Sequence, residues 1–85
     1  MRLVDITVET VKGTYEGKEY DFDRYNVEQR SPMATHESSV VVDALTGEIT
    51  GDCIRYGSWG DLELEECLEL LKIVEAEGKL LRPYK

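Results

Sequence analysis

The spacing of apolar residues changes once along this chain of 85 residues, and that change constrains the fold more than any other feature. Before position 57 apolar and polar residues tend to alternate, as in Val4-Asp5-Ile6-Thr7-Val8. A period of two is typical of strands that bury one face. After position 61 apolar residues recur at steps of three and four, which is the period of an amphipathic helix. The sequence therefore predicts a sheet followed by one helix.

A first hairpin is predicted from residues 3–15 and about 19–29. Between them Glu16-Gly17-Lys18 forms a tight turn, in which Gly17 supplies the positive φ that such turns need. The alternation changes parity within the second of these strands, which predicts a β-bulge near Asp23-Arg24.

A second hairpin follows after a loop at residues 31–37. Val40-Val41-Val42 is a β-branched apolar run, typical of a central strand. Thr46-Gly47 marks the turn, and residues 49–56 form the return strand, with a candidate bulge at Gly51.

The helix is predicted over about residues 59–77. Ser58 and Asp61 have the spacing of a capping box, and Gly78 is placed to end the helix. The predicted core stripe consists of Leu64, Cys67, Leu68, Leu71 and Val74. We therefore expect one α+β domain: a four-stranded antiparallel sheet over about residues 2–57, one C-terminal helix packed on a face, and a basic tail at 78–85, in the order ββββα.

No export or membrane signal is evident in the sequence. Met1-Arg2 leads directly into the first strand, without the apolar segment of a signal peptide. No apolar stretch approaches the ~20 residues that span a bilayer. We expect a cytoplasmic protein, in the host cell if it is phage-encoded, with Cys53 and Cys67 as reduced thiols. A disulfide between these two cysteines is the alternative.

Charge restricts the partners. The formal net charge is −8, and seven acidic residues lie between Asp61 and Glu77 against the single base Lys72. Such a field repels nucleic acid and anionic membranes and attracts basic protein surfaces. The basic residues form no stripe, and no Gly-rich loop precedes the helix, so direct binding of nucleic acid or phosphate is not expected.

His36 is the single histidine, and Glu37 and Ser38 follow it directly. Neighbours in sequence seldom have the geometry of a catalytic triad, and no serine elbow is present. Structural zinc sites draw ligands from closely spaced pairs, which His36, Cys53 and Cys67 do not form. We therefore expect no catalytic residue, metal or cofactor. A small enzyme that uses His36 or a carboxylate pair is an alternative.

Two surfaces are candidates for binding a partner protein. On the helix, apolar residues outside the core stripe are mixed with acids, so that the apolar groups provide affinity and the acids provide steering. On the second strand, three carboxylates are expected on one face, with neighbours ~6.5–7 Å apart. The alternatives are that the segment 80–84 covers the apolar helix residues and that the strand acids are an ordinary solvated face. The candidate residues are Leu62, Glu63, Glu66, Glu69 and Ile73 on the helix, with Leu70 beside them, and Glu19, Asp21 and Asp23 on the strand.

In size and charge the chain is similar to small acidic phage or prophage proteins that block nucleic-acid-handling host enzymes, including inhibitors of CRISPR effectors. This likeness covers bulk properties and no motif. We expect a non-enzymatic interaction module that occupies a basic surface of a partner, in its sharper form a nucleic-acid mimic. Mimicry requires the strand and helix carboxylates to share one exposed surface. The alternative is a structural or homo-oligomeric subunit that pairs through a sheet edge or through a seam at Leu62 and Ile73.

Overall fold

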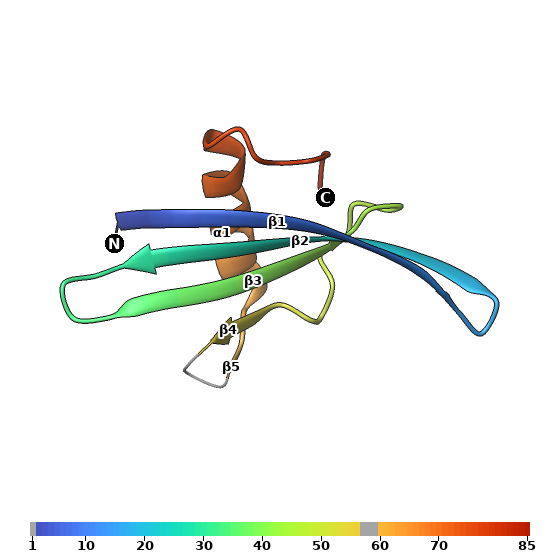
Figure 1. Ribbon diagram of the computed structural model, residues 1–85, viewed down its shortest axis with the longest axis horizontal. Helices are drawn as coiled ribbons and strands as arrows, with labels where there is room; N and C mark the ends of the chain where they lie inside the picture. Colours follow the sequence, from blue (N-terminus) through green and yellow to red (C-terminus); the bar gives the residue numbers. More distant parts are fainter. Residues whose placement is uncertain (1, 57–59) are drawn as a thin grey trace.

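The computed structural model describes residues 2–56 and 60–85. Its elements are the strands β1 (Arg2–Tyr15), β2 (Lys18–Arg30), β3 (Thr35–Asp43), β4 (Ile54–Tyr56) and β5 (Gly60–Asp61), and the helix α1 (Leu64–Ala76). The strands form one antiparallel sheet in sequential order, and α1 lies across one face (Figure 1). The predicted α+β fold is confirmed, with five strands in place of four. No helix in the described part of the chain is long and apolar enough to cross a membrane.

The additional strand occupies residues that the sequence assigned to the start of the helix. Gly60 and Asp61 pair with Arg55 and Ile54, so the helix begins only at Leu64. Its N-cap residue is Glu63, and no side chain caps it. The predicted capping box depends on Ser58, which lies outside the described residues.

Strand β2 contains no bulge, so the predicted bulge near Asp23 is wrong. Its register against β1 and β3 runs without a shift, and the irregularity lies instead between Leu3 and Asp5 of β1. Asp23 and Tyr25 therefore share one face of the sheet. The change of parity in the sequence arises because Tyr20 and Phe22 lie on one face of the sheet and Tyr25 and Val27 on the other, where the polar Asp23 is also buried. Gly51 lies in a turn before β4, not in a strand.

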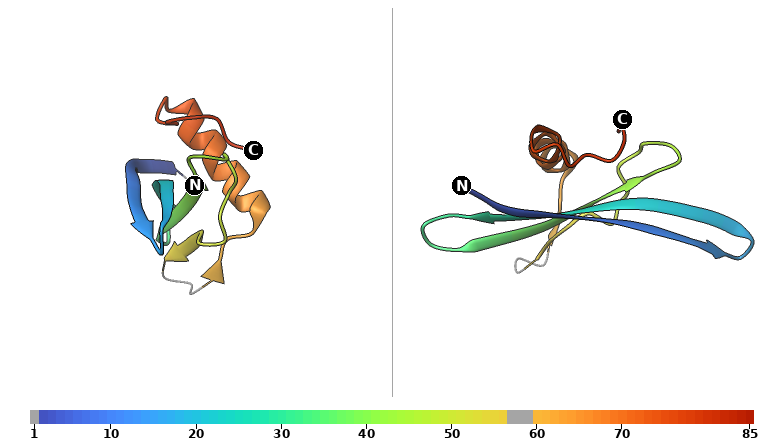
Figure 2. Two further views of the ribbon diagram at one scale, coloured as in Figure 1. Left: turned by 90° about the vertical axis from the view of Figure 1, so that its right-hand side faces the viewer. Right: turned by 45° about the horizontal axis from the view of Figure 1, so that its top comes forward.

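The core lies between α1 and the face of the sheet that it covers, which we call the inner face; the opposite face is the outer face (Figure 2). The sheet contributes Ile6, Tyr25, Val27, Val40 and Val42, and the helix contributes Cys67, Leu70, Leu71 and Val74. Leu64, predicted in the core stripe, is 61% exposed, and Leu70 is buried in its stead. Burial of Leu62 ahead of the helix anchors the start of α1 and leaves Leu64 in solvent.

The C-terminal segment folds back across the inner face. Gly78 has φ +72°, and the Lys79 N–H donates to the Val74 carbonyl at 3.0 Å, which confirms the predicted helix end as a Schellman motif. Further along, the Leu81 N–H donates to the Tyr25 hydroxyl at 3.2 Å. The last residue, Lys85, donates its backbone N–H to the Gly47 carbonyl at 2.7 Å. The tail thereby joins the helix, the central strands and the β3–β4 connection.

Strands β1 and β2 continue beyond the end of β3 as a two-stranded arm, residues 12–21 (Figures 1 and 2). The turn at its tip places Glu16 at φ 49° and Gly17 at φ 78°, the backbone of a type I′ hairpin. On the outer face, the ring of Tyr20 in the arm stacks on the ring of Phe22 at its base, with centroids 5.9 Å apart. The Tyr20 ring lies over Gly13, where a Cβ atom would overlap it.

Candidate partner-binding surfaces

Asp23 is a buried residue, so its predicted display to a partner is wrong. Its side chain is fully inaccessible, and Arg82 of the tail donates to it from Nε at 2.6 Å and from Nη2 at 3.1 Å. The Thr10 hydroxyl donates to the same carboxylate at 3.4 Å. Hydrogen bonding to Asp23 raises the pKa of the Arg82 guanidinium. The pair holds the C-terminal segment on the sheet, a structural role.

The other two strand acids share the inner face with Asp23 but differ in exposure. The side chain of Asp21 is 18% exposed and lies 3.8 Å from the Lys12 ammonium. Its Oδ1 atom is buried without a hydrogen-bond partner among the described residues. Glu19 is exposed, far out on the arm. These three carboxylates therefore present one free charge to a partner, not three.

The apolar pair predicted on the helix surface is not exposed. Leu62 is only 9% accessible, and its N–H donates to the Cys53 carbonyl at 3.0 Å. Ile73 packs partly against the core. The predicted docking of a partner on Leu62 therefore fails on burial. Leu62 and Cys53 belong to the same core cluster, and the tail leaves the opposite end of α1 (Figure 1).

The helix acids divide into free and paired groups. Glu66 forms an ion pair with Arg55 of β4, whereas Glu63 and Glu69 are exposed. Of the six carboxylates expected to imitate phosphates, Asp23 is buried, and Asp21 and Glu66 form ion pairs. Glu19 on the arm, the N-cap residue Glu63 and Glu69 of α1 are exposed.

A different group of acids lies together on the outer face. Asp5 of β1, Glu28 of β2 and Glu37 of β3 are direct cross-strand partners, and we call them the acidic row. Tyr56 of β4 continues the row opposite Glu37 and is 48% exposed. These four residues line a shallow hollow of about 360 Å³, together with Thr7, Asn26, Val27 and Ser38.

The acidic row makes no ion pair within the described residues, although Arg2 and Arg30 form the next pair of β1 and β2 on the same face. Among the described residues, the ion pairs are Lys12–Asp21, Arg24–Glu9, Arg55–Glu66 and Arg82–Asp23, and none includes a member of the row. Side chains directly opposite on antiparallel strands have Cβ atoms ~4.5–5.5 Å apart, and like charges at that separation are destabilising. The helix cannot relieve this repulsion, since it covers the other face (Figure 2).

A second hollow, of about 250 Å³, lies on the inner face beside α1. Its lining includes His36, Ser38, Arg55, Glu66 and Glu69. His36 Nε2 lies 3.4 Å from the Ser31 hydroxyl, which also bonds the backbone of Ala34 within the β2–β3 loop. A carboxylate hydrogen-bonded to His36, as a triad needs, is missing among the described side chains, and Ser31 is occupied by its turn.

The two cysteines are buried, free thiols, as expected for reduced residues. Cys53 Sγ accepts the Val41 N–H at 3.3 Å and donates to the Thr50 carbonyl at 3.4 Å, so it completes the hydrogen bonding of β3 where β4 is absent. Burial, with a smaller contribution from the Cys53 thiol, raises the pKa of Cys67 to about 12. Within residues 2–56 and 60–85, no three His, Cys, Asp or Glu side chains lie where they could hold one metal ion.

Comparison of the chain with protein-family models, curated proteins and solved structures finds no match.

Proposed function

We propose that the chain is a non-enzymatic protein-interaction module whose outer face binds basic side chains of a partner protein. One observation carries the proposal: Asp5, Glu28 and Glu37 lie opposite one another on three neighbouring strands, with no ion pair to offset their charge. A bound base converts this mutual repulsion into attraction. The basic-surface partner expected from composition is retained, and its docking surface moves from the helix and the inner face of β2 to the outer face of the sheet.

The chemistry of the hollow suits an arginine or lysine side chain. Carboxylates accept charge-assisted hydrogen bonds, which are shorter and stronger than neutral ones. The exposed ring of Tyr56 offers a face on which a guanidinium can stack. Thr7 and Asn26, the next outer-face pair along β1 and β2, add neutral hydrogen-bonding groups beside the acids. An anionic ligand would meet three carboxylates and is disfavoured.

Proteins that handle nucleic acid carry basic surfaces of this kind. The particular form that we propose is an inhibitor that occupies such a surface, for example on a CRISPR effector, and so competes with the nucleic acid. The inhibitor needs no imitation of a phosphate backbone, because a few carboxylates that pair with essential basic residues suffice.

Matched charge reversals test the proposal. The tagged native chain is used as bait in a host extract, beside a double variant of the outer face, Glu28→Lys with Glu37→Lys, and a double variant of the helix, Glu65→Lys with Glu69→Lys. Both variants change the net charge equally. We expect the native chain and the helix variant to retain the same basic protein, and the outer-face variant to lose it. The reverse pattern would restore the helix as the docking surface, and equal loss would show that only net charge matters.

A further inference from the structure

β1 is the terminal strand of the sheet, and one of its sides carries no neighbouring strand in the described chain. The Ile6 carbonyl accepts a hydrogen bond from Lys79 Nζ at 3.1 Å, so this carbonyl points away from β2. In an antiparallel ladder the direction of the backbone groups alternates from residue to residue. The register from Asp5 to Tyr15 has no shift, so the backbone groups of the even-numbered residues up to Thr14 also point to the free side.

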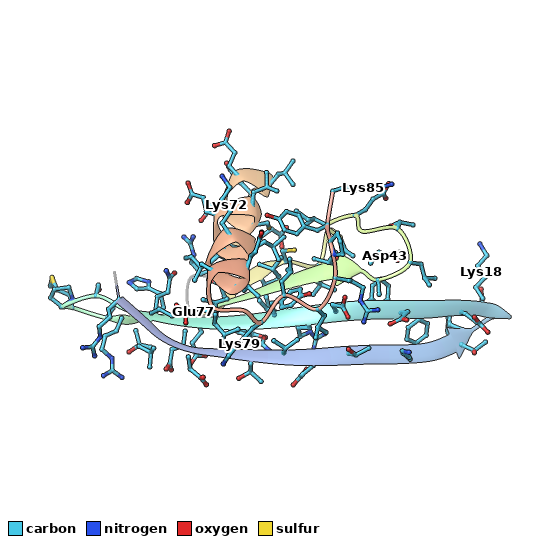
Figure 3. The ribbon with its side chains drawn as sticks, turned by 90° about the horizontal axis from the view of Figure 1, so that it is seen from above. Lys18, Asp43, Lys72, Glu77, Lys79 and Lys85 are labelled. Atoms are coloured by element: carbon cyan, nitrogen blue, oxygen red, sulfur yellow. The ribbon has the colours of Figure 1, made fainter. Side chains whose placement is uncertain are left out.

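The free stretch of this edge runs from Val8 to Thr14. The part before it is protected by a bulge between Leu3 and Asp5 and by the tail residue Lys79, devices that natural proteins use on edge strands. Figure 3 views the molecule from this edge, with Lys79 against the first half of β1 and Lys18 at the tip of the arm. No hydrogen bond among the described residues reaches the even-numbered backbone groups of the free stretch.

Two copies of the free stretch can pair with each other about a twofold axis at Val11. The stretch is symmetric about this residue, so an antiparallel pair joins Val8 to Thr14 and Thr10 to Lys12. All of these positions direct their backbone groups to the free side, and each therefore meets a donor and an acceptor of the second copy. The stretch is complementary to itself without any shift of register.

On the outer face this pairing gathers the apolar residues of the arm. Val11, which is 37% exposed, lies directly opposite Val11 of the second copy, and Phe22 is its neighbour on β2. The central row of the joined sheet then consists of Val11 and Phe22 from both copies. Tyr20, which stacks on Phe22, and Tyr15, which is 70% exposed, flank this row. Aromatic and β-branched side chains are favourable neighbours across strands.

We propose that the chain forms a homodimer in which the two β1 strands pair antiparallel over Val8–Thr14, with the twofold axis at Val11. The two sheets become one continuous sheet, in which each copy keeps its own helix on the inner face. The inference goes beyond the proposed function and does not depend on it, because the acidic rows lie at opposite ends of the joined outer face and stay open.

An axis at a neighbouring residue is disfavoured. An axis at Lys12 places two lysines directly opposite each other, which is destabilising. An axis at Thr10 brings Thr14 of the second copy to Ile6, where Lys79 already occupies the edge.

The axis at Val11 instead uses Lys79 favourably. It brings Ile6 opposite Glu16 of the second copy, the first residue of the turn, so that Lys79 meets a carboxylate at the end of the added strand. Neither Lys79 nor Glu16 takes part in an ion pair among the described residues of one copy.

The formal net charge of −8 does not prevent this pairing. Asp5 of the acidic row is six residues from Val11 along β1, roughly 20 Å, so the two acidic rows are roughly 40 Å apart in the dimer. The Debye length at physiological ionic strength is about 8 Å, so each row is screened from the other. The free stretch carries one acid, Glu9, and one base, Lys12, and each forms an ion pair within its own copy.

The test measures mass in solution by sedimentation equilibrium over a range of concentrations, for the native chain, Val11→Lys and Val11→Glu. Each variant alone places two like charges directly opposite at the axis, whereas an equal mixture of the two allows a heterodimer with opposite charges there. Val4→Lys and Val4→Glu make the same changes at an exposed valine outside the free stretch and are the controls. Circular dichroism verifies that the variants fold.

We expect the native chain and the Val4 variants to form a dimer, and each Val11 variant alone to have a dissociation constant about tenfold higher. The mixture of Val11→Lys with Val11→Glu should recover the lost affinity. In the native chain, the amides on the free side should exchange more slowly as the concentration rises, because they donate across the interface. These are the amides of Val8, Thr10, Lys12 and Thr14.

A native chain that stays monomeric at every concentration would overturn the inference and leave the proposed function intact, since binding of a basic partner is measured separately. A dimer that the Val4 and Val11 substitutions weaken equally, or that the mixture fails to restore, would overturn it as well. Glu28→Gln with Glu37→Gln should leave the dimer intact. Dissociation of the dimer by these two substitutions would place the contact at the acidic row and not at the β1 edge.

Discussion

Asp23 is a buried carboxylate stabilised by a residue 59 positions later in the chain. Asp23→Asn keeps the shape of the side chain but removes its charge, and Arg82 then loses its charge-assisted hydrogen bonds. We expect the free energy of unfolding to fall by about 1–3 kcal/mol, measured by urea denaturation. Asp52→Asn, an exposed aspartate, is the matched control. Equal effects of the two substitutions would show that Asp23 and Arg82 contribute little.

Ionisation of Cys67 should make the free energy of unfolding depend on pH in the alkaline range. Its pKa is raised from 9.0 to about 12 by burial, so the unfolded chain releases this proton more readily than the folded chain. The stabilisation is fully present below pH 9 and is lost as pH rises toward 12. We expect a loss of about 2–4 kcal/mol over that window in reducing buffer. Tyr25, whose pKa is raised by burial, acts in the same direction above pH 10.

Urea denaturation at pH 8 and pH 11 measures this loss, with Cys67→Ala as the comparison. The variant lacks the thiol, so its stability should fall less between the two pH values, whatever its stability at pH 8. A fall of the same size in both proteins would assign the alkaline sensitivity to other groups.

At the scale of elements, the arm depends on cross-strand packing because α1 does not cover it. Gly13 weakens a strand interior, and the ring of Tyr20 compensates by lying over it. Tyr20→Ala should therefore destabilise the arm by about 0.5–1.5 kcal/mol and accelerate amide exchange at residues 12–21. Tyr15→Ala, at an exposed position near the tip, should leave exchange nearly unchanged. A larger effect at Tyr15 would contradict this account of the arm.

At the scale of the whole molecule, the acidic row should lower stability in the absence of a partner. Glu37→Gln removes one of three neighbouring charges, so the free energy of unfolding should rise by about 0.2–1 kcal/mol. The gain should shrink in high salt, which screens exposed charges. Glu48→Gln, in the β3–β4 connection, changes the same net charge and should give no gain. A loss of stability in Glu37→Gln would mean that the row is compensated after all.

Much of this architecture could be predicted from the sequence, because the fold class depends on hydrophobic period and turn residues. The pairing of Asp5 with Glu28 in the acidic row could also have been predicted from the sequence. A two-residue turn at Glu16-Gly17 pairs Tyr15 with Lys18, and the same register places Asp5 opposite Glu28. The partnership of Asp23 with Arg82 could not, because it joins residues distant in the chain. Unless the ion pair with Arg82 is known, the aspartate on the buried face reads as a change of parity, which predicts a β-bulge. The burial of Leu62 likewise depends on where the helix begins, which period alone leaves uncertain by several residues.

We propose that the outer face, and not the helix, binds basic side chains. Titration of the isotope-labelled chain with a short arginine-containing peptide, followed by amide chemical shifts, tests it most directly. We predict shifts centred on Asp5, Glu28, Glu37 and Tyr56, which disappear in Glu28→Gln with Glu37→Gln and persist in Glu65→Gln with Glu69→Gln. Shifts confined to α1, or abolished by the helix substitutions, would contradict the claim.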